Sequence, residues 1–151
     1  MEWKKDNYTV STDKNNLNVS VIHNYLKNSY WSPGIPKSTV KKSIDNSLTF
    51  GLFDGEKQIG FAKMITDYAT FAYLADVFVI DEYKGQGLGK WMMTCVMSHP
   101  DLQGLRRIML ATRDAQKLYE KFGFTPLHNP DRFMQLWKPN VYAMPPQAPF
   151  S

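Results

Sequence analysis

Three glycines at two-residue intervals follow directly on a predicted buried strand. They are Gly85, Gly87 and Gly89. Residues 73–80 before them are rich in aromatic and β-branched side chains, which is typical of a buried strand. Residues 88–97 after them carry apolar residues at a helical spacing. Backbone N–H groups are free at the start of a helix, and the helix dipole favours negative charge there, so the turn predicts a phosphate-binding site.

The glycine spacing does not fit the two common nucleotide motifs. A P-loop has a glycine five residues before a Gly-Lys pair and a Ser or Thr after it. Here Lys84 stands at the first position and Trp91 at the second. A dinucleotide motif reads G-x-G-x-x-G early in a βαβ unit, whereas this chain has G-x-G-x-G late in its sequence. A strand, turn and helix without a ligand is the structural alternative.

Residues 84–89, KGQGLG, resemble the acyl-CoA turn of the GCN5-related N-acetyltransferases (GNAT), whose signature is Arg/Gln-x-x-Gly-x-Gly/Ala. Lys84 stands where Arg or Gln is usual, and it keeps a positive charge without the planar fork of Arg. The resemblance implies that acetyl-CoA is the cofactor. It also implies that the backbone of the preceding strand pairs with the pantetheine arm and that a bulge opens the sheet there. The cofactor-binding residues implied are Val77, Phe78, Val79, Lys84, Gly85, Gln86, Gly87, Leu88, Gly89 and Lys90.

A second segment, residues 115–124, matches the pattern A-x-x-L-Y-x-x-x-G-F that the family often carries. The resemblance implies that Tyr119 lies near the sulfur of CoA and protonates the departing thiolate, which a phenol can do. The alternative is a core tyrosine whose hydroxyl reaches the surface. Thr112 stands near the place where the family often has an asparagine that binds the pantetheine arm, and a threonine can still form a hydrogen bond.

Family members also often hold an acidic residue on the strand before the turn, where it deprotonates the acceptor amine. The expected position holds Ala75, and the next residue, Asp76, is the carboxylate that could act as catalytic base. A carboxylate inside an apolar strand is costly unless it is used or paired. The alternative is a structural Asp76 that pairs with a lysine or caps a loop amide. Asp67 is a second candidate on the acceptor side, and a chain of waters could also serve as base.

Aromatic residues gather where an acceptor could bind. Tyr30 and Trp31 begin a loop, residues 30–36, in which two prolines and a glycine exclude a helix. They either line an acceptor pocket or anchor the loop on the core. Aromatic rings stabilise cations, so a small amine with an apolar body would fit. The predicted acceptor-binding residues are Tyr30, Trp31, Asp67 and Tyr73.

The elements that must position these residues mix hairpins with crossover helices. Hydrophobic spacing and turn residues predict helices at 17–26, from 38 onward, at 88–97 and at 115–122, and strands at 8–12, 48–53, 58–66, 73–80, 106–112, 124–127 and 133–137. The order is β-α-α-β-β-β-α-β-α-β-β, an α/β fold with a mixed sheet. We expect one GNAT domain over residues 1–138 and a Pro-rich tail over residues 139–151.

The amino-acid composition limits the class of protein and the cellular compartment that we expect. The chain has 151 residues, a length typical of one domain, and a net charge of +4 that is scattered rather than clustered, so no nucleic-acid partner is expected. The single cysteine, Cys95, excludes an internal disulfide, and no signal peptide or long apolar run is evident. These features predict a cytoplasmic protein without membrane contact. The three histidines are dispersed, so no metal site is implied.

The leading hypothesis is therefore an enzyme that moves an acetyl group from acetyl-CoA to a primary amine, by direct attack in a ternary complex. The aromatic residues favour a small-molecule acceptor over a protein lysine or N-terminus. A non-catalytic acyl-CoA-binding module of the same fold is the alternative from another class, motivated by Lys84, Ala75 and Thr112. Dimers are common in the family, so a homodimer fits the resemblance.

Overall fold

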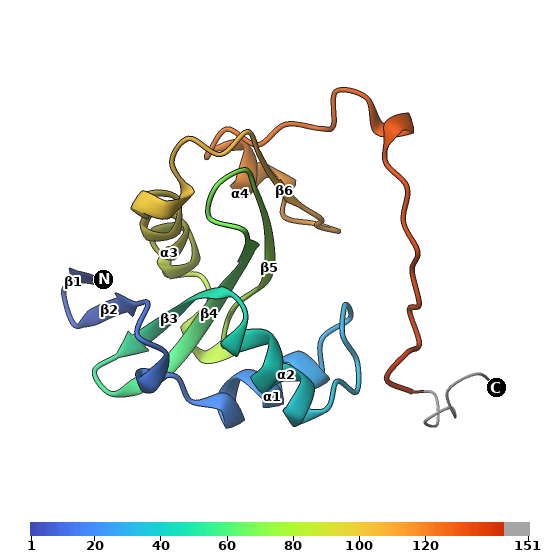
Figure 1. Ribbon diagram of the computed structural model, residues 1–151. Coiled ribbons are helices and arrows are strands. Elements are labelled where there is room, and N and C mark those ends of the chain that lie inside the picture. Colours follow the sequence, from blue (N-terminus) through green and yellow to red (C-terminus); the bar gives the residue numbers. More distant parts are fainter. Residues whose placement is uncertain (144–151) are drawn as a thin grey trace.

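The computed structural model describes residues 1–143, in which six strands form one sheet in sequence order (Figure 1). Every neighbouring pair is antiparallel except the last, which is parallel. The mixed α/β class predicted from the sequence is confirmed. The strands are β1 (Glu2–Lys5), β2 (Tyr8–Ser11), β3 (Leu48–Asp54), β4 (Lys57–Thr66), β5 (Phe71–Val79) and β6 (Arg107–Leu110).

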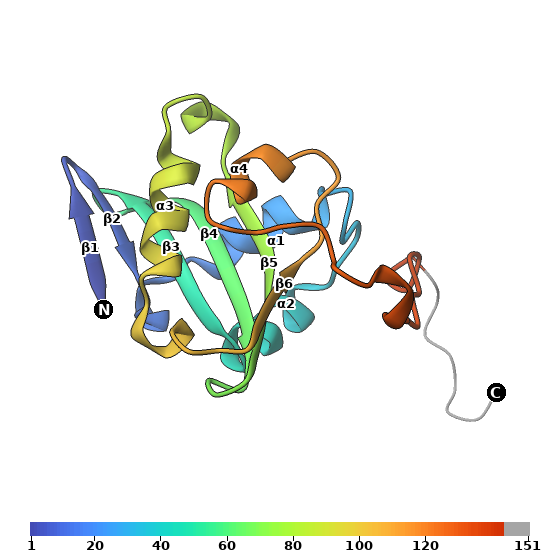
Figure 2. The ribbon, with the colours of Figure 1, turned by 90° about the horizontal axis from the view of Figure 1, so that it is seen from above.

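Within residues 1–143, four α-helices cover the two faces of the sheet. Figures 1 and 2 show α1 and α2 together on one face and α3 on the other. The sheet is thus the middle layer of three, as expected when hairpins mix with crossover helices. The helices are α1 (Val19–Lys27), α2 (Lys37–Asp45), α3 (Leu88–Met97) and α4 (Gln116–Glu120).

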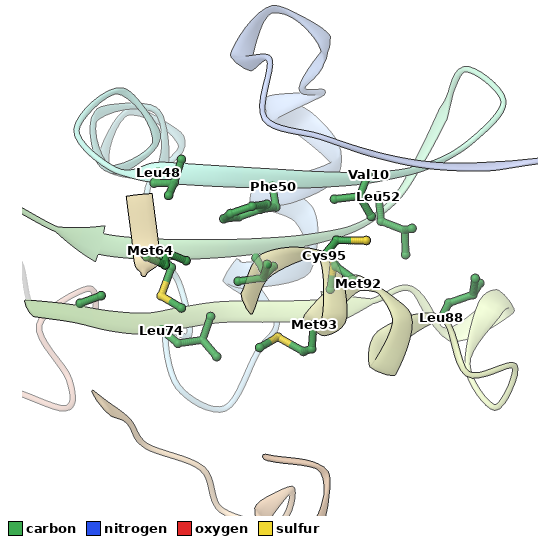
Figure 3. Close-up of a cluster of buried hydrophobic side chains, with 14 of the residues drawn as sticks. Val10, Leu48, Phe50, Leu52, Met64, Leu74, Leu88, Met92, Met93 and Cys95 are labelled. Carbon is green, nitrogen blue, oxygen red and sulfur yellow. The ribbon is translucent and has the colours of Figure 1, made fainter. Parts of the chain in front are cut away.

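The larger core lies between the sheet and α3. Met92 and Met93 of α3 are fully buried against Phe50 and Met64 of the sheet (Figure 3). Cys95 lies in the same cluster, and burial raises the pKa of its thiol to about 11. The packed thiol predicted from the sequence is confirmed.

A smaller core lies under α1 and α2. Ile22 and Leu26 of α1 and Val40 of α2 pack there with Phe78 of β5. The ring of Phe78 stacks on Tyr25 at a centroid distance of 4.0 Å and an interplanar angle of 7°. This contact fixes α1 on the end of β5 that precedes the glycine turn.

Two predicted strands, residues 124–127 and 133–137, do not form, and that part of the prediction is wrong for the single chain. Helix α4 ends at Glu120, Gly123 follows with φ +91°, Pro126 offers no N–H group, and a short 3-10 turn lies at Pro130–Arg132. A strand gains its stability from a partner ladder, and neither segment meets one here.

The first strand, β1, was not predicted. Its sequence, Glu-Trp-Lys-Lys, has one apolar residue and resembles a solvated segment. Pairing with β2 and the packing of Trp3 against Phe50, at 6.1 Å between ring centroids, hold it in the sheet. In the described chain, no helix is long and apolar enough to span a membrane. Residues 144–151 of the predicted tail lie outside the described residues.

Candidate active site

The glycine turn places open backbone at the start of α3. Gly85 and Gly87 have φ values of +81° and +78°, and a Cβ added at either would meet nothing within 4 Å. Gly87 is the N-cap residue of α3, and no side chain caps it. The first amides of the helix therefore have no side-chain acceptor at the cap. Gly89 differs, because its φ is ordinary and an added Cβ would make an ordinary 3.8 Å contact with Val79.

A lysine ammonium lies beside this turn. Nζ of Lys84 is 2.7 Å from Oδ1 of Asp81 and donates to the Tyr25 hydroxyl at 3.3 Å. The hydrogen bond to Asp81 is the main reason that the pKa of Lys84 is raised. The charge is thus held at the turn rather than left on a free side chain. Leu88 is buried in the main core, so only its backbone faces the turn, whereas Gln86 and Lys90 are exposed.

Strand β5 carries a bulge where a cofactor would enter. Phe61 of β4 pairs with Phe78 and Lys63 pairs with Ala75, so Asp76 and Val77 together lie opposite one residue of β4. Asp76 takes up the extra length with φ +56. The bulge expected from the family resemblance is present at this strand.

The sheet also opens on the other side of β5. Its parallel pairing with β6 ends at Leu74 and Leu110, whereas β5 continues to Val79. Within the described chain, residues 75–79 therefore have no strand on the β6 side. Such an unpaired edge can accept an extended ligand as an added strand. Val77 and Val79 pack against the main core and Phe78 packs in the smaller one, so these three residues have their backbone to offer.

Tyr119 of α4 lies close to this opening with little solvent contact. Its side chain is 9% exposed, and its ring meets Phe124 edge-on at 6.0 Å between centroids. Desolvation raises the pKa of Tyr119, and the nearby Tyr30 phenol adds to the rise. The phenol therefore keeps its proton at neutral pH. Thr112 lies at the start of the same segment, where its hydroxyl accepts a hydrogen bond from the Ala115 amide at 3.0 Å.

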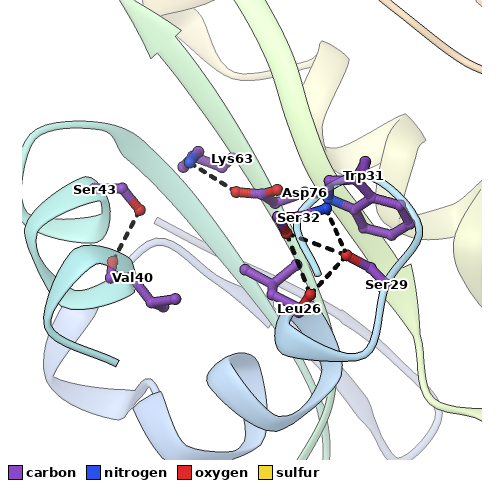
Figure 4. A network of polar contacts seen from close by, with 8 residues as sticks. All are labelled: Leu26, Ser29, Trp31, Ser32, Val40, Ser43, Lys63 and Asp76. Carbon is purple, nitrogen blue, oxygen red and sulfur yellow. Dashed lines mark hydrogen bonds and ion pairs between the residues drawn. The ribbon is translucent and has the colours of Figure 1, made fainter. Parts of the chain in front are cut away.

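Asp76 is held by two side chains. Its Oδ2 lies 2.7 Å from Nζ of Lys63, and its Oδ1 accepts a hydrogen bond from Nε1 of Trp31 at 2.8 Å (Figure 4). The Lys63 and Asp76 side chains are 9% and 12% exposed, so the pair is largely desolvated. Both carboxylate oxygens are thus engaged by side chains of this chain. The lysine pairing weighed from the sequence is therefore the arrangement found.

The loop after α1 is fixed by short-range hydrogen bonds. The buried Ser29 and Ser32 hydroxyls lie 3.1 Å apart, and both donate to the Leu26 carbonyl. Tyr30 and Trp31, between them, meet edge-on at 5.1 Å. The exposed Tyr30 ring lies 3.9 Å from the guanidinium carbon of Arg113. The loop thus spans the opening from the β5 bulge to the segment before α4.

One predicted acceptor residue, Asp67, lies elsewhere, whereas Tyr73 stands three residues before Asp76 on β5. Asp67 belongs to the turn between β4 and β5, where its Oδ1 accepts hydrogen bonds from the amides of Ala69, Thr70 and Phe71. Tyr73 pairs with Ile65 and Met109 near the beginning of β5. At about 3.3 Å per residue, the bulge lies about 16 Å further along from Phe71. The structure therefore does not bring Asp67 to Asp76 and Tyr119.

Two residues that shape the site were not predicted, Lys63 and Arg113. Lys63 stands alone among apolar residues in β4, and this signal could have paired it with Asp76, the lone charge in β5. Arg113 had no comparable signal, because it lies in an exposed polar loop. Among the described residues, no group of three His, Cys, Asp or Glu side chains could hold a metal ion.

The chain is similar to acetyltransferases in sequence and structure. The sequence model of the acetyltransferase (GNAT) family matches residues 19–124. The protein named "Putative acetyltransferase FG08082" of Gibberella zeae is 32% identical over 142 residues, which cover 79% of each chain. A crystal structure from Xanthomonas campestris pv. campestris, described as belonging to the GNAT family, has 46% identity and a TM-score of 0.90, with 93% of this chain and 100% of that chain covered.

A third likeness concerns the fold alone. A predicted acetyltransferase of Clostridium acetobutylicum, solved with acetyl-CoA, has a TM-score of 0.64 and 17% identity, with 86% of this chain and 94% of that chain covered. The family match spans the glycine turn, the β5 bulge and α4, and it covers more than half of the chain. This chain belongs to the acetyltransferase (GNAT) family.

Proposed function

We propose that this chain transfers an acetyl group from acetyl-CoA to a primary amine of a small molecule, by direct attack in a ternary complex. One observation carries the proposal: β5 loses its β6 partner after Leu74, at the bulge and next to the glycine turn. The unpaired edge of β5 is therefore followed along the chain by the free N-terminus of α3. That combination suits a ligand with a phosphate group at one end and an extended amide arm at the other.

The residues present fit such a ligand. Gly85, Gly87 and the first amides of α3 would hold the pyrophosphate, with the Lys84 ammonium beside them. The backbone of residues 77–79 would pair with the pantetheine arm. Space supports this assignment, because a Cβ at Gly85 or Gly87 would meet no atom of the chain within 4 Å.

Bound acetyl-CoA would supply a thioester carbonyl that an amine can attack, with release of the CoA thiol. The Tyr119 hydroxyl is the proton donor that we assign to the departing sulfur. Its raised pKa keeps it protonated at neutral pH, and its burial shields the donor from water. A backbone N–H of the β5 bulge would polarise the carbonyl, as in other oxyanion sites.

Asp76 has a positioning role in this proposal. Lys63 and Trp31 engage both of its oxygens, so the carboxylate fixes the aromatic loop against the bulge. The proton of the attacking amine would leave to water through the open site. Asp67 has no part, because the turn that it stabilises lies at the far end of β5.

The acceptor side favours a small amine. The Tyr30 ring and Arg113 meet at 3.9 Å across the opening, and Trp31, which contacts Tyr30, is fixed by its hydrogen bond to Asp76. This bridge would hinder a folded protein surface while admitting a small molecule. The acetyl-CoA in the Clostridium acetobutylicum structure supports the choice of cofactor at the level of the fold.

The test is thermal unfolding with and without acetyl-CoA, with ATP and NAD as controls. A ligand at about 100 times its Kd adds about 2.7 kcal/mol, which is a shift of a few degrees for this chain length. Thiol release is then measured with small primary amines and with a lysine peptide. We expect a shift with acetyl-CoA alone and turnover with small amines. No shift contradicts the cofactor assignment, whereas a shift without turnover supports an acyl-CoA-binding module instead.

A further inference from the structure

The guanidinium of Arg113 lies at the opening of the candidate active site. Its central carbon stands over the Tyr30 ring, 3.9 Å from the ring centre, which is a stacked cation–π contact. The Arg113 side chain is nevertheless 65% exposed. A guanidinium that stacks by its flat face keeps the N–H groups of its edge available, because these point outward in the plane of the group. Arg113 can therefore bind a ligand without giving up its contact with Tyr30.

The ring beneath Arg113 is held in place by its own loop. Two serine hydroxyls of the loop donate to the Leu26 carbonyl. The neighbouring Trp31 meets the Tyr30 ring edge-on at 5.1 Å and donates a hydrogen bond to Asp76. The guanidinium thus has a defined position before a ligand arrives, and such preorganisation lowers the entropic cost of binding.

The charges around the opening favour an anionic ligand. Nη2 of Arg113 lies 3.6 Å from Oδ2 of Asp114, and these side chains are 65% and 69% exposed. An ion pair in such an exposed position contributes little stability, so another anion can replace it. The Lys63 and Asp76 pair is different, because its atoms are 2.7 Å apart and largely desolvated. The opening therefore presents the positive charge of Arg113 to an incoming acceptor.

The stacked arginine changes what the aromatic loop can bind. The sequence predicts that aromatic rings there stabilise the cation of the amine. In the structure, the chain supplies that cation itself, since Arg113 covers a face of the Tyr30 ring. An ammonium group at this place would be repelled by the guanidinium, whereas an anionic group of the same molecule would be attracted. A carboxylate suits the arginine well, because its two oxygens match two parallel N–H groups of the guanidinium edge.

We infer that the acceptor is a small primary amine that carries a carboxylate, and that Arg113 binds this carboxylate at the opening. This substrate class rests on the proposed function, to which it adds the charge of the acceptor. Tyr30, beneath the guanidinium, lies close enough to Tyr119 to contribute to the raised pKa of that residue. The bound carboxylate and the proposed proton donor thus belong to one site, in which Arg113 determines specificity.

Binding is tested by isothermal titration calorimetry of amino carboxylates into the full chain, with and without CoA, which has no acetyl group to transfer. The probes are glycine, β-alanine, γ-aminobutyrate and L-phenylalanine, each compared with its own uncharged carboxamide, and phosphoethanolamine. We expect at least one carboxylate to bind about 10-fold or more tightly than its carboxamide. Arg113→Gln should weaken that carboxylate about 10- to 100-fold, which is typical of a lost charge-assisted hydrogen bond, and leave the carboxamide unchanged. Arg113→Lys should restore part of the affinity, since lysine keeps the charge without the planar fork.

Arg106→Gln is the matched control. Arg106 is also exposed, and its amide donates to the Thr70 carbonyl at the far end of β5. This variant removes the same charge away from the opening, so the affinities for all probes should stay as in the wild type. In acetylation assays, Arg113→Gln should raise KM for the carboxylate with little change in kcat or in the Kd for acetyl-CoA, because the arginine holds the acceptor and takes no part in the chemistry.

Several results would overturn the inference. These are no measurable binding of any carboxylate, equal affinities for carboxylates and carboxamides, and a carboxylate preference that survives in Arg113→Gln or that Arg106→Gln also removes. Tighter binding of phosphoethanolamine than of every carboxylate would assign the site to a phosphate instead. The titrations need neither an acetyl group nor turnover, so they decide the charge preference by themselves. Failure to bind acetyl-CoA contradicts the proposed function and is seen separately, in the thermal shift.

Discussion

Lys63 and Asp76 face each other across β4 and β5, with 2.7 Å between Nζ and Oδ2. The two side chains are 9% and 12% exposed, which makes this the most buried of the ion pairs found in the described chain. Asp76 also occupies the bulge and binds Trp31. One ion pair therefore ties the opening of the sheet to the aromatic loop.

Removal of one partner should be strongly destabilising. We expect Lys63→Met to lose about 3–5 kcal/mol, because it leaves a buried carboxylate without its counter-ion. Lys63→Met/Asp76→Asn should recover part of this loss, since asparagine tolerates the positive φ of position 76. Urea unfolding measures both. The exposed pair Lys41 and Asp45 is the control, and Lys41→Met should change stability by less than about 1 kcal/mol.

Tyr119→Phe should lower kcat by about 10²–10⁴ while the Kd for acetyl-CoA changes little, because the phenol acts on the leaving group. The pKa of Tyr119 is raised, so its proton-donating form persists to higher pH than for an ordinary tyrosine. An alkaline fall of kcat that is set by this group should therefore lie at higher pH than for an ordinary tyrosine and should disappear in Tyr119→Phe. Tyr68→Phe, in the exposed turn between β4 and β5, is the matched control. Equal rates for all three proteins would exclude the proposed role.

Gly87→Ala should weaken acetyl-CoA binding at least about 10-fold, because the new Cβ occupies the space of the phosphates and the backbone has φ +78. Gly55→Ala is matched, since Gly55 has φ +58 and equally open surroundings in the turn between β3 and β4. Both should lose similar stability, and the control should bind normally. Isothermal titration calorimetry measures the affinity for acetyl-CoA of both variants. Their comparison separates damage to the binding site from the effect of backbone strain. Similar affinities for the two variants would count against the assigned turn.

Asp67 should make the stability of the β4–β5 turn depend on pH. Hydrogen bonds from Thr70, Ala69 and Phe71 hold the pKa of Asp67 well below its ordinary value near 3.8. A lowered pKa means that the carboxylate stabilises the fold above pH 3.8 and that this contribution is lost as the pH falls through the folded pKa. The Tm difference between wild type and Asp67→Ala should be constant from pH 7 to about pH 5 and should narrow below about pH 4.

The Asp67→Ala variant also tests whether Asp67 takes part in binding the amine. Because Asp67 lies at the far end of β5, kcat and KM for the amine should be unchanged in Asp67→Ala. A raised KM for the amine would show that Asp67 contributes to acceptor binding.

Cys95 should not react with a thiol reagent in the folded protein at neutral pH. Its side chain is 3% exposed, and burial raises the pKa of the thiol to about 11, so little thiolate is present. We expect labelling by dithionitrobenzoate only as urea unfolds the chain, with the same midpoint as the fluorescence change. Rapid labelling without denaturant would show that α3 opens locally.

The sequence predicted best where local chemistry decides the structure. Gly85 and Gly87 were expected at a turn before a helix, and both adopt the positive φ that glycine permits. The helix over 88–97 was predicted to the residue, because its apolar spacing is long and regular. The bulge at Asp76 came from the family resemblance, since no local pattern marks an extra residue in an apolar strand.

Prediction failed where the outcome depends on distant partners. Residues 133–137 have a strand composition, but a strand needs an adjacent edge, and the single chain holds them away from β6. Glu2–Lys5 lacks a strand composition and is nevertheless a strand, because β2 offers it an edge. Lys63 and Asp76 were each visible as charges in apolar strands, yet their pairing depends on the register of two strands.

The order of strand pairing determines when each part of the candidate active site forms during folding. Three pairings, β1–β2, β3–β4 and β4–β5, are hairpins between neighbours in the chain, whereas the β5–β6 pairing must wait for a crossover through α3. Loop closure delays such long-range contacts relative to local ones. The bulge therefore belongs to the early, locally closed part of the chain, and the glycine turn follows it at the start of the crossover. Tyr119 reaches them only with the late docking of β6, so unfolding should lose catalysis before the meander of β3 to β5 comes apart.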